Sequence, residues 1–399
     1  MASRFLRALL WLASAAAAVA FAVVVVRRFD NPIAPTAVEG ALLDYVQRLL
    51  QHRPLYAEPS IPSPPALMPG FPAALSLLAR VVGLDLSELR FISVVATVLS
   101  AGAVIVIVRA ETMSWTFAAA GGGFVFAGCA FIVGQPELAR PEMLMLLLAL
   151  AGFGAVRYTL GIPGALLAAL LLTAGCFIDP MGAWFTVAAM TYMAIEDTRR
   201  FVVTLLAVAL LSGCGYVVLS LLLGPWFNFF AWDLPLHSLR FEPATLHRFL
   251  GTQLLGRLGV LTLATVLSFA LPAPPWRGSR GLWMFMGFAT LGAGLLATQG
   301  AAFESELLVP GVIVLALLGP ISLERVTRHL AAWPGSSRVE GHGIALAALA
   351  LQFLAFSTAV PAAFKSQAAA ANPAAVSAPP ARLAVATPAV PSDSARAGH

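Results

Sequence analysis

Long apolar runs recur along this chain from its N-terminus to about residue 361, and they constrain its fold more than any other feature. About 20 apolar residues in a helix span the hydrocarbon core of a bilayer. Charged residues make up only 11% of the chain, against roughly a quarter in an average soluble protein. The sequence therefore predicts an all-α, polytopic integral membrane protein folded as a helical bundle. We expect about eleven spans, near residues 6–26, 90–108, 115–134, 142–157, 162–178, 180–195, 201–223, 257–273, 281–298, 307–321 and 343–361.

One further apolar stretch, residues 66–83, is interpreted differently. Pro65, Pro69 and Pro72 interrupt its start, and Arg80 lies in its last turn. Proline inside a helix removes a hydrogen bond and clashes with the preceding turn, so we expect a surface or re-entrant helix here. The choice decides the topology, because one more span would reverse every later loop.

The connections between the spans are of two kinds. With the N-terminus inside, the inner connections are short and carry arginines, as the positive-inside rule requires. Two long connections, residues 27–89 and 224–256, then lie outside. The bias toward alanine and arginine is typical of a GC-rich bacterial genome. We therefore expect a multi-pass protein of the bacterial inner membrane, with a cytoplasmic N-terminus and an extracytoplasmic working face. A cleavable signal peptide is the alternative for the first run, but the length of that run favours an uncleaved helix.

The domain organisation follows from the apolar runs. Residues 1–361 are expected to form one transmembrane domain. Residues 362–399 are rich in alanine, proline and serine and poor in large apolar side chains. Such a segment cannot bury enough apolar surface to fold alone, so we expect a disordered tail.

The first long loop contains an amphipathic segment that begins near Glu39. Its apolar side chains recur at helical spacing, which predicts a juxtamembrane helix lying on the bilayer. The apolar side consists of Leu42, Leu43, Val46, Leu49 and Leu50. Glu39 has two interpretations: it completes a capping box with Thr36, or it is a carboxylate held in place for chemistry.

Two further candidate sites, each with an acidic residue, lie at the ends of predicted spans. Arg140 and Glu142 stand beside Pro141 at a helix start, where proline and an acid also have a structural explanation. A guanidinium and a carboxylate at the membrane surface can also bind phosphate or orient a hydroxyl. Asp179 and Pro180 lie between two closely spaced apolar runs, and Asp-Pro is a common turn.

The second long loop is rich in aromatic residues between Gly224 and His237. Tryptophan near lipid headgroups is ordinarily part of an interfacial belt. Together with Asp233, His237, Arg240 and His247, these rings could instead line a groove for a sugar and a lipid phosphate.

Composition disfavours several other classes of site. Cys129, Cys176 and Cys214 fall singly in apolar runs, and the histidines have no convincing metal-ligand spacing. The arginines are spread along short loops, so we expect no nucleic-acid partner. Lys365 is the only lysine, and arginine suits phosphate better than lysine does.

Several short elements follow one another in a characteristic order. They are the acid Glu39, Arg48-Leu49-Leu50, Pro54-Leu55-Tyr56, Pro64-Pro65, Ala139-Arg140-Pro141-Glu142, the Gly224-Pro225-Trp226-Phe227 loop that runs to His237, and Glu304-Ser305-Glu306 before a late span. In this order they resemble the GT-C superfamily of membrane glycosyltransferases, and in particular the protein O-mannosyltransferases and the lipid A aminoarabinose transferases. The resemblance covers residues 27–360.

The resemblance implies a hexosyl- or pentosyltransferase that takes a sugar from a polyprenyl-phosphate donor. The acceptor would be an extracytoplasmic lipid, glycan or protein, and membrane lipid would be a partner. Glu39 would be the general base, and Glu142 would position the acceptor or a divalent cation, the one cofactor implied. The phosphate and the rest of the substrates would be bound by Arg140, with Arg48, Arg53, Asp179, His237 and Arg240 as further candidates.

The chain departs from its relatives at three of these positions. Glu39 stands alone where relatives often have two adjacent acids, Glu142 replaces the usual aspartate, and Asp179 replaces lysine or another polar residue. These departures leave two alternative functions open. One is a transporter or flippase for a lipid-linked sugar, and the other is an inactive scaffold in envelope glycan assembly.

Overall fold

The computed structural model describes residues 2–30, 37–56, 68–133, 139–224, 226–234, 247, 249–271, 278–297, 308–331 and 338–370. All regular secondary structure in these ranges is helical. His237 and Arg240 lie outside the described residues, as do Thr36, Glu304 and Glu306.

A helix occupies each of the expected spans. These helices are α1 (Ala2–Asp30), α4 (Leu86–Thr112), α5 (Trp115–Ala127) with its π-helical continuation η1 (Gly128–Val133), α6 (Pro141–Tyr158), α7 (Gly161–Ile178), α8 (Gly182–Glu196), α9 (Thr198–Leu223), α13 (Gly256–Ala270), α14 (Gly278–Ala297), α15 (Val309–Ala331) and α16 (Arg338–Ala370). Within the described residues, 7 helices are long and apolar enough to cross a membrane: α1, α4, α5 with η1, α6, α7, α9 and α15. The chain is thus a polytopic, helical membrane protein, while the number eleven stays a prediction.

The end of the last helix corrects one expected boundary. We expected a disordered tail from residue 362, but α16 continues to Ala370. Residues 362–370 contain five alanines, and alanine has the highest helix propensity. The remainder of the expected tail, residues 371–399, lies outside the described residues.

Local sequence explains the tight connections between the central helices. Asp197 caps α9, because its Oδ1 accepts a hydrogen bond from the backbone N–H of Arg200 at 3.1 Å. Arg200 in turn donates through Nη2 to the carbonyl oxygens of Val156 at 2.8 Å and Thr159 at 3.3 Å, where α6 ends. A cation at a helix C-terminus satisfies its last carbonyls. The ends of α6 and the start of α9 are thereby held together.

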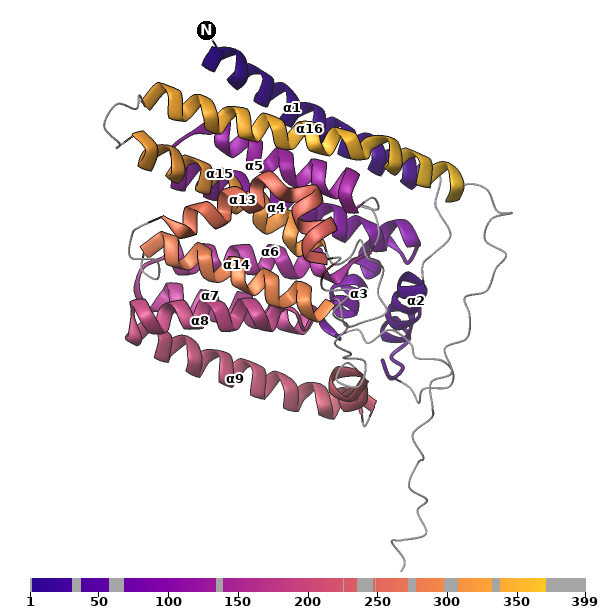
Figure 1. Cartoon of the computed structure of the whole chain (residues 1–399). Helices are drawn as coiled ribbons and strands as arrows, with labels where there is room; N and C mark the ends of the chain where they lie inside the picture. Colours follow the sequence, from indigo (N-terminus) through magenta and orange to yellow (C-terminus); the bar gives the residue numbers. More distant parts are fainter. Residues whose placement is uncertain are drawn as a thin grey trace, which may run out of the picture.

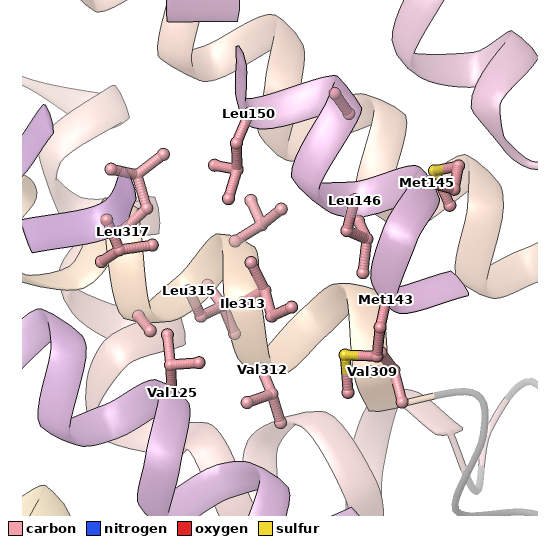
Figure 2. Packing of buried hydrophobic residues seen from close by; sticks show 14 of the residues in the cluster. Val125, Met143, Met145, Leu146, Leu150, Val309, Val312, Ile313, Leu315 and Leu317 are labelled. Atoms are coloured by element: carbon pink, nitrogen blue, oxygen red, sulfur yellow. The ribbon is translucent and has the colours of Figure 1, made fainter. Parts of the chain in front are cut away.

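The core lies around α15, which packs against α6, α5 and α13. Figure 2 shows Val309 and Ile313 of α15 facing Met143 and Leu146 of α6, and all four side chains are buried. Long helices α1 and α16 lie side by side along one edge of the bundle, and α9 forms the opposite edge (Figure 1).

The first long loop contributes two shorter helices, α2 (Ala37–Leu50) and α3 (Gly70–Val82), which pack on each other at one end of the bundle (Figure 1). At about 1.5 Å per residue, α3 is about 20 Å long, less than the roughly 30 Å of a bilayer core. Its first residue, Gly70, lies against the last turn of α7. The approach is so close that a Cβ atom at this position would clash with the carbonyl oxygen of Phe177. The length of α3 therefore supports a surface helix in this segment.

The opposite end of the bundle is tied together by arginines. Glu111, at the end of α4, accepts hydrogen bonds from Arg157 Nε at 2.8 Å and from the Tyr158 hydroxyl at 3.2 Å, both at the end of α6. Arg280 donates to three carbonyl oxygens at the end of α13, at 2.7 to 2.8 Å. These contacts place the ends of α4, α6 and α13 where the expected topology has its short inner loops.

Candidate active site

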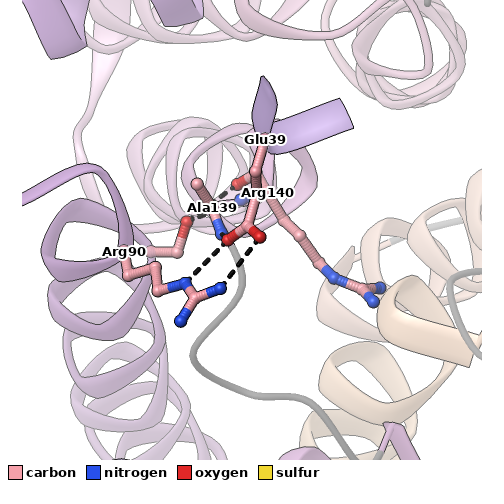
Figure 3. A network of polar contacts seen from close by, with 5 residues as sticks. Glu39, Arg90, Ala139 and Arg140 are labelled. Atoms are coloured by element: carbon pink, nitrogen blue, oxygen red, sulfur yellow. Dashed lines mark hydrogen bonds and ion pairs between the residues drawn. The ribbon is translucent and has the colours of Figure 1, made fainter. Parts of the chain in front are cut away.

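The acidic side chain singled out in the first loop forms a buried ion pair. Arg90, in the first turns of α4, donates through Nε to Glu39 Oε1 at 2.8 Å and through Nη2 to Glu39 Oε2 at 2.9 Å. The side chains are only 1% and 2% exposed, with Glu39 the more buried. Figure 3 shows the two parallel contacts. This fork geometry is the strong form of an arginine–carboxylate pair, and it docks α2 onto α4.

The same carboxylate also reaches the segment that precedes α6. Glu39 Oε1 accepts a hydrogen bond from the backbone N–H of Ala139 at 3.2 Å. The next residue, Arg140, is locked by Ser93 of α4, whose Oγ accepts from the Arg140 N–H at 2.8 Å and donates to the Arg140 carbonyl oxygen at 3.2 Å. Two sites that lie 100 residues apart in sequence are thus joined at one carboxylate.

Arg140 is buried, with 6% of its surface exposed. Its backbone is extended, with φ of −124° and ψ of 124°, and it is the N-cap residue of α6. In Figure 3 its side chain extends away from the Glu39–Arg90 pair, toward helices from the later part of the chain. The structure therefore brings Arg140 beside Glu39 through its main chain, while its guanidinium points in a different direction.

These contacts bear on the capping interpretation of Glu39. Thr36, the partner in the expected capping box, lies outside the described residues. The carboxylate of Glu39 bonds to Arg90 and to the N–H of Ala139, both outside its own helix. Glu39 thus joins three segments of the bundle.

Arg90 is the residue that the sequence analysis missed. It stands at the start of the apolar run 90–108, where an arginine is expected to snorkel to the surface. Instead it is 2% exposed. A charge buried beside a membrane span is costly unless it is paired, and the pairing with Glu39 meets this requirement.

Asp179 lies in the short turn between α7 and α8, and part of its role is structural. Its Oδ1 accepts from the backbone N–H of Met181 at 2.8 Å, which makes the turn expected of an Asp-Pro pair. The residue is also buried, at 7% exposed. Burial and the neighbouring charge of Glu142 raise the pKa of Asp179 from 3.8 to about 7, although the hydrogen bond from Met181 opposes them. Asp179 and Glu142 are therefore near enough for the charge of one to act on the other.

Substitution of Asp179 by asparagine is expected to stabilise the protein at neutral pH. The unfolded chain has an ordinary aspartate pKa near 4, so between about pH 4 and pH 7 the folded state keeps a proton that the unfolded state releases. Stability therefore falls as pH rises through this window. Asparagine keeps an oxygen for the Met181 N–H, and at about 1.4 kcal/mol per pKa unit its gain above pH 7 is a few kcal/mol.

The measurement is thermal unfolding in detergent micelles at several pH values from about 4.5 to 8. The advantage of Asp179→Asn over wild type should grow as pH rises. Asp85→Asn, at an exposed aspartate, is the matched control and should show no such trend. An advantage of Asp179→Asn that stays constant with pH would contradict the assigned titration.

An aromatic cluster joins the two long loops. Tyr56, which follows α2, stacks on Phe230 with ring centroids 5.0 Å apart and also lies 5.7 Å from Tyr45 of α2. Phe230 belongs to the π-helical segment η2 (Phe229–Asp233), which follows α9 and the short helix α10 (Trp226–Asn228). Burial of the Tyr56 ring raises the pKa of its hydroxyl. Phe230 of the second loop therefore packs against Tyr56 of the first loop. The interfacial belt stays a prediction.

Arg48 and Arg53 lie apart from Glu39. Both line an open pocket of about 740 Å³ between α2 and the end of α9. Arg48 pairs with Asp44 at 2.8 Å on the same helix, and Arg53 is exposed in the turn that follows. The structure thus places Arg48 and Arg53 at this pocket, away from the buried Glu39.

A divalent cation was the one cofactor that the resemblance implied. Within the described ranges, no group of three or more His, Cys, Asp and Glu side chains is placed to hold a metal ion. Glu142 and Asp179 form a pair of acids only. Metal use therefore stays a prediction.

Comparison with known proteins identifies relatives by fold alone. No family model matches the chain, and no curated protein matches it. The crystal structure of ArnT from Cupriavidus metallidurans bound to undecaprenyl phosphate aligns with a TM-score of 0.58 and 11% identity, over 90% of this chain and 78% of that chain. The apo state of the same protein gives 0.51 and 11%, over 85% and 74%.

A third structure is more distant. The archaeal oligosaccharyltransferase AglB from Archaeoglobus fulgidus, in complex with an inhibitory peptide and a dolichol-phosphate, aligns with a TM-score of 0.47 and 13% identity, over 89% of this chain and 56% of that chain. ArnT is a member of the GT-C superfamily. The likeness to ArnT supports the resemblance at the level of the fold alone: the chain shares the helical arrangement of ArnT.

Proposed function

We propose that this protein is a membrane glycosyltransferase that transfers a sugar from a polyprenyl-phosphate donor to an extracytoplasmic acceptor in the bacterial envelope. The observation that carries the proposal is the buried contact of Glu39 with Arg90 and Ala139, directly beside Arg140. This arrangement holds an acid, the arginine that pairs with it and the main chain of a second arginine at one end of a GT-C-like bundle. ArnT, which shares the fold, has been crystallised with undecaprenyl phosphate.

The proposed chemistry is a displacement at the anomeric carbon of the sugar. The acceptor hydroxyl oxygen forms the new bond to that carbon as the bond to the phosphate oxygen of the donor breaks. The acceptor proton passes to Glu39 as general base, and the polyprenyl phosphate leaves with the electron pair of the broken bond. The two parallel hydrogen bonds from Arg90 fix the orientation of the Glu39 carboxylate.

Arg140 is proposed to stabilise the leaving phosphate. Negative charge grows on the phosphate oxygen in the transition state, and a positioned guanidinium stabilises it most where water is excluded. Ser93 holds both polar groups of the Arg140 main chain. The backbone from which the guanidinium side chain extends is therefore fixed in position. Glu142 is proposed to orient the acceptor, beside Asp179. His237 and Arg240 remain proposed binding residues of the second loop.

The test is a comparison of envelope lipids and glycans, by mass spectrometry, from bacterial strains with and without the gene. We expect one sugar modification to disappear in the deletion strain and to return with the wild-type gene. Purified protein in proteoliposomes should then transfer that sugar covalently from a labelled donor. Movement of the labelled donor across the bilayer without transfer would show a flippase, and unchanged envelope chemistry would remove the support for an enzyme.

A further inference from the structure

The open pocket between α2 and α9 has two chemically different walls. Polar side chains from the second half of α2 and the turn after it form one wall, and the end of α9 with the following loop forms the other. The polar wall includes Gln47, Arg48, Gln51 and Arg53, and the other wall includes Leu221, Leu222 and Trp226. Its volume of about 740 Å³ is within the usual range of roughly 300 to 1,000 Å³ for small-ligand sites. A ligand that fits both walls must be amphiphilic.

The charge on the polar wall is positive. Asp44 is the acid among the residues that line the pocket, and it faces two arginines, Arg48 and Arg53. Arg48 is paired with Asp44, but both side chains are partly exposed, at 31% and 52%, where an ion pair contributes little and exchanges readily. Guanidinium groups bind phosphate through two parallel hydrogen bonds. The polar wall therefore favours a phosphate-bearing ligand.

The turn that carries Arg53 is well anchored. The backbone N–H of Arg53 donates to the carbonyl oxygen of Arg48 at 2.8 Å, which brings the two arginines to one end of α2. Three residues later, Tyr56 is buried against Phe230. The turn is thus already held in place before an anion binds to these arginines. This lowers the entropic cost of binding.

The apolar wall faces the lipid phase. Leu221 and Leu222 are 79% and 74% exposed, and they end a 26-residue candidate span whose most apolar part is only 6% buried in the protein. In a membrane, such a surface is covered by acyl or prenyl chains. The pocket therefore opens where lipid tails end and headgroups begin, with Trp226 at a typical interfacial position.

The pocket is distinct from the cluster around Glu39. Arg48 follows Glu39 by nine residues on one helix, which at about 100° and 1.5 Å per residue places it on the opposite face and about 13 Å along the axis. Glu39 is buried against α4, whereas Arg48 faces the open pocket. One phosphate cannot contact both groups at once.

We propose that this pocket binds the phosphate headgroup of a membrane lipid, at a second site separate from the Glu39–Arg90 pair. The arginines of α2 hold the phosphate, and the leucines at the end of α9 contact the first part of the lipid tail. The proposal does not rest on the proposed sugar transfer, because it follows from the charge of one wall and the membrane position of the other.

The experiment is native mass spectrometry of the full-length protein in detergent, with equal amounts of phosphatidic acid and phosphatidylcholine. We expect wild type to retain phosphatidic acid about tenfold over phosphatidylcholine, because a phosphate monoester can receive both guanidinium groups without a competing choline. The combined variant Arg48→Gln with Arg53→Gln should retain the two lipids about equally. Arg80→Gln removes an exposed arginine of α3 outside the pocket and should behave as wild type.

Three outcomes would overturn the proposal. They are an absence of preference in wild type, an unchanged preference in the combined variant, and an equal loss in Arg80→Gln. Addition of millimolar inorganic phosphate separates the sources of the phosphate group, since displacement of phosphatidic acid by it would show a site for free phosphate and not for a lipid. Should the combined variant unfold, Arg53→Gln alone is expected to reduce the preference severalfold, as judged on protein with a wild-type melting temperature. A variant that loses sugar transfer but still retains phosphatidic acid would be affected at the Glu39 site only.

Discussion

Replacement of Glu39 by glutamine is expected to abolish sugar transfer and to lower the stability of the protein. Glutamine cannot accept the proton of an acceptor hydroxyl, and the substitution removes the carboxylate charge that pairs with the buried guanidinium of Arg90. Removal of one partner from a buried ion pair costs about 3 to 5 kcal/mol. Transfer of labelled sugar in proteoliposomes and thermal unfolding in detergent measure the two effects. Arg90→Gln should cause a similar loss of stability.

An exchange of the two charges separates catalysis from stability. In the double variant Glu39→Arg with Arg90→Glu, the ion pair can form again with its charges reversed, so we expect the melting temperature to recover partly relative to either single variant. Transfer should remain absent, because the carboxylate now originates from α4 and no longer accepts the N–H of Ala139 from the position of Glu39. Recovery of transfer together with stability would mean that Glu39 has a structural role alone.

Substitution of Arg140 by glutamine is expected to reduce the rate of transfer by a factor of about 10² to 10³, the usual effect of losing one group that stabilises transition-state charge. The main chain of Arg140 is held by Ser93 through two hydrogen bonds that do not involve the guanidinium. The fold should therefore survive, and the melting temperature should change little. Steady-state kinetics with a polyprenyl-phosphate sugar measure the effect.

Conservative and distant replacements complete this test. Arg140→Lys keeps the charge but loses the planar fork, so its rate should fall between wild type and Arg140→Gln. Arg80→Gln, at an exposed arginine on α3, should transfer sugar at the wild-type rate. A wild-type rate in Arg140→Gln would remove Arg140 from the proposed mechanism.

Much of the fold was predictable from the sequence, because length and apolar composition decide where a membrane helix begins and ends. Each expected span contains a helix, and the proline-interrupted stretch 66–83 contains only the short helix α3. The exception is the last helix, which continues past residue 361 to Ala370. There the scarcity of large apolar side chains did not end the helix, because alanine, which makes up five of residues 362–370, favours helix.

The candidate site was less predictable. Glu39, Arg140, Glu142 and Asp179 were identified from local pattern, and the structure brings Glu39 beside Arg140 and Asp179 beside Glu142. Arg90 escaped notice because nothing within its own segment distinguishes a buried arginine from one that snorkels to the surface. Arg48 and Arg53 share a helix and a turn with Glu39, yet helical geometry directs them to a different pocket.

By itself, the sequence determined that this chain is a helical membrane protein, where its helices lie, and which acids stand at their ends, because these properties depend on neighbouring residues. The tertiary structure decided that Glu39 pairs with Arg90, 51 residues away, and that Arg48 and Arg53 meet the end of α9. The physical reason is that a buried charge takes whichever partner packing brings within hydrogen-bond distance, and the packing of α2 on α3 and α4 is a property of the whole bundle.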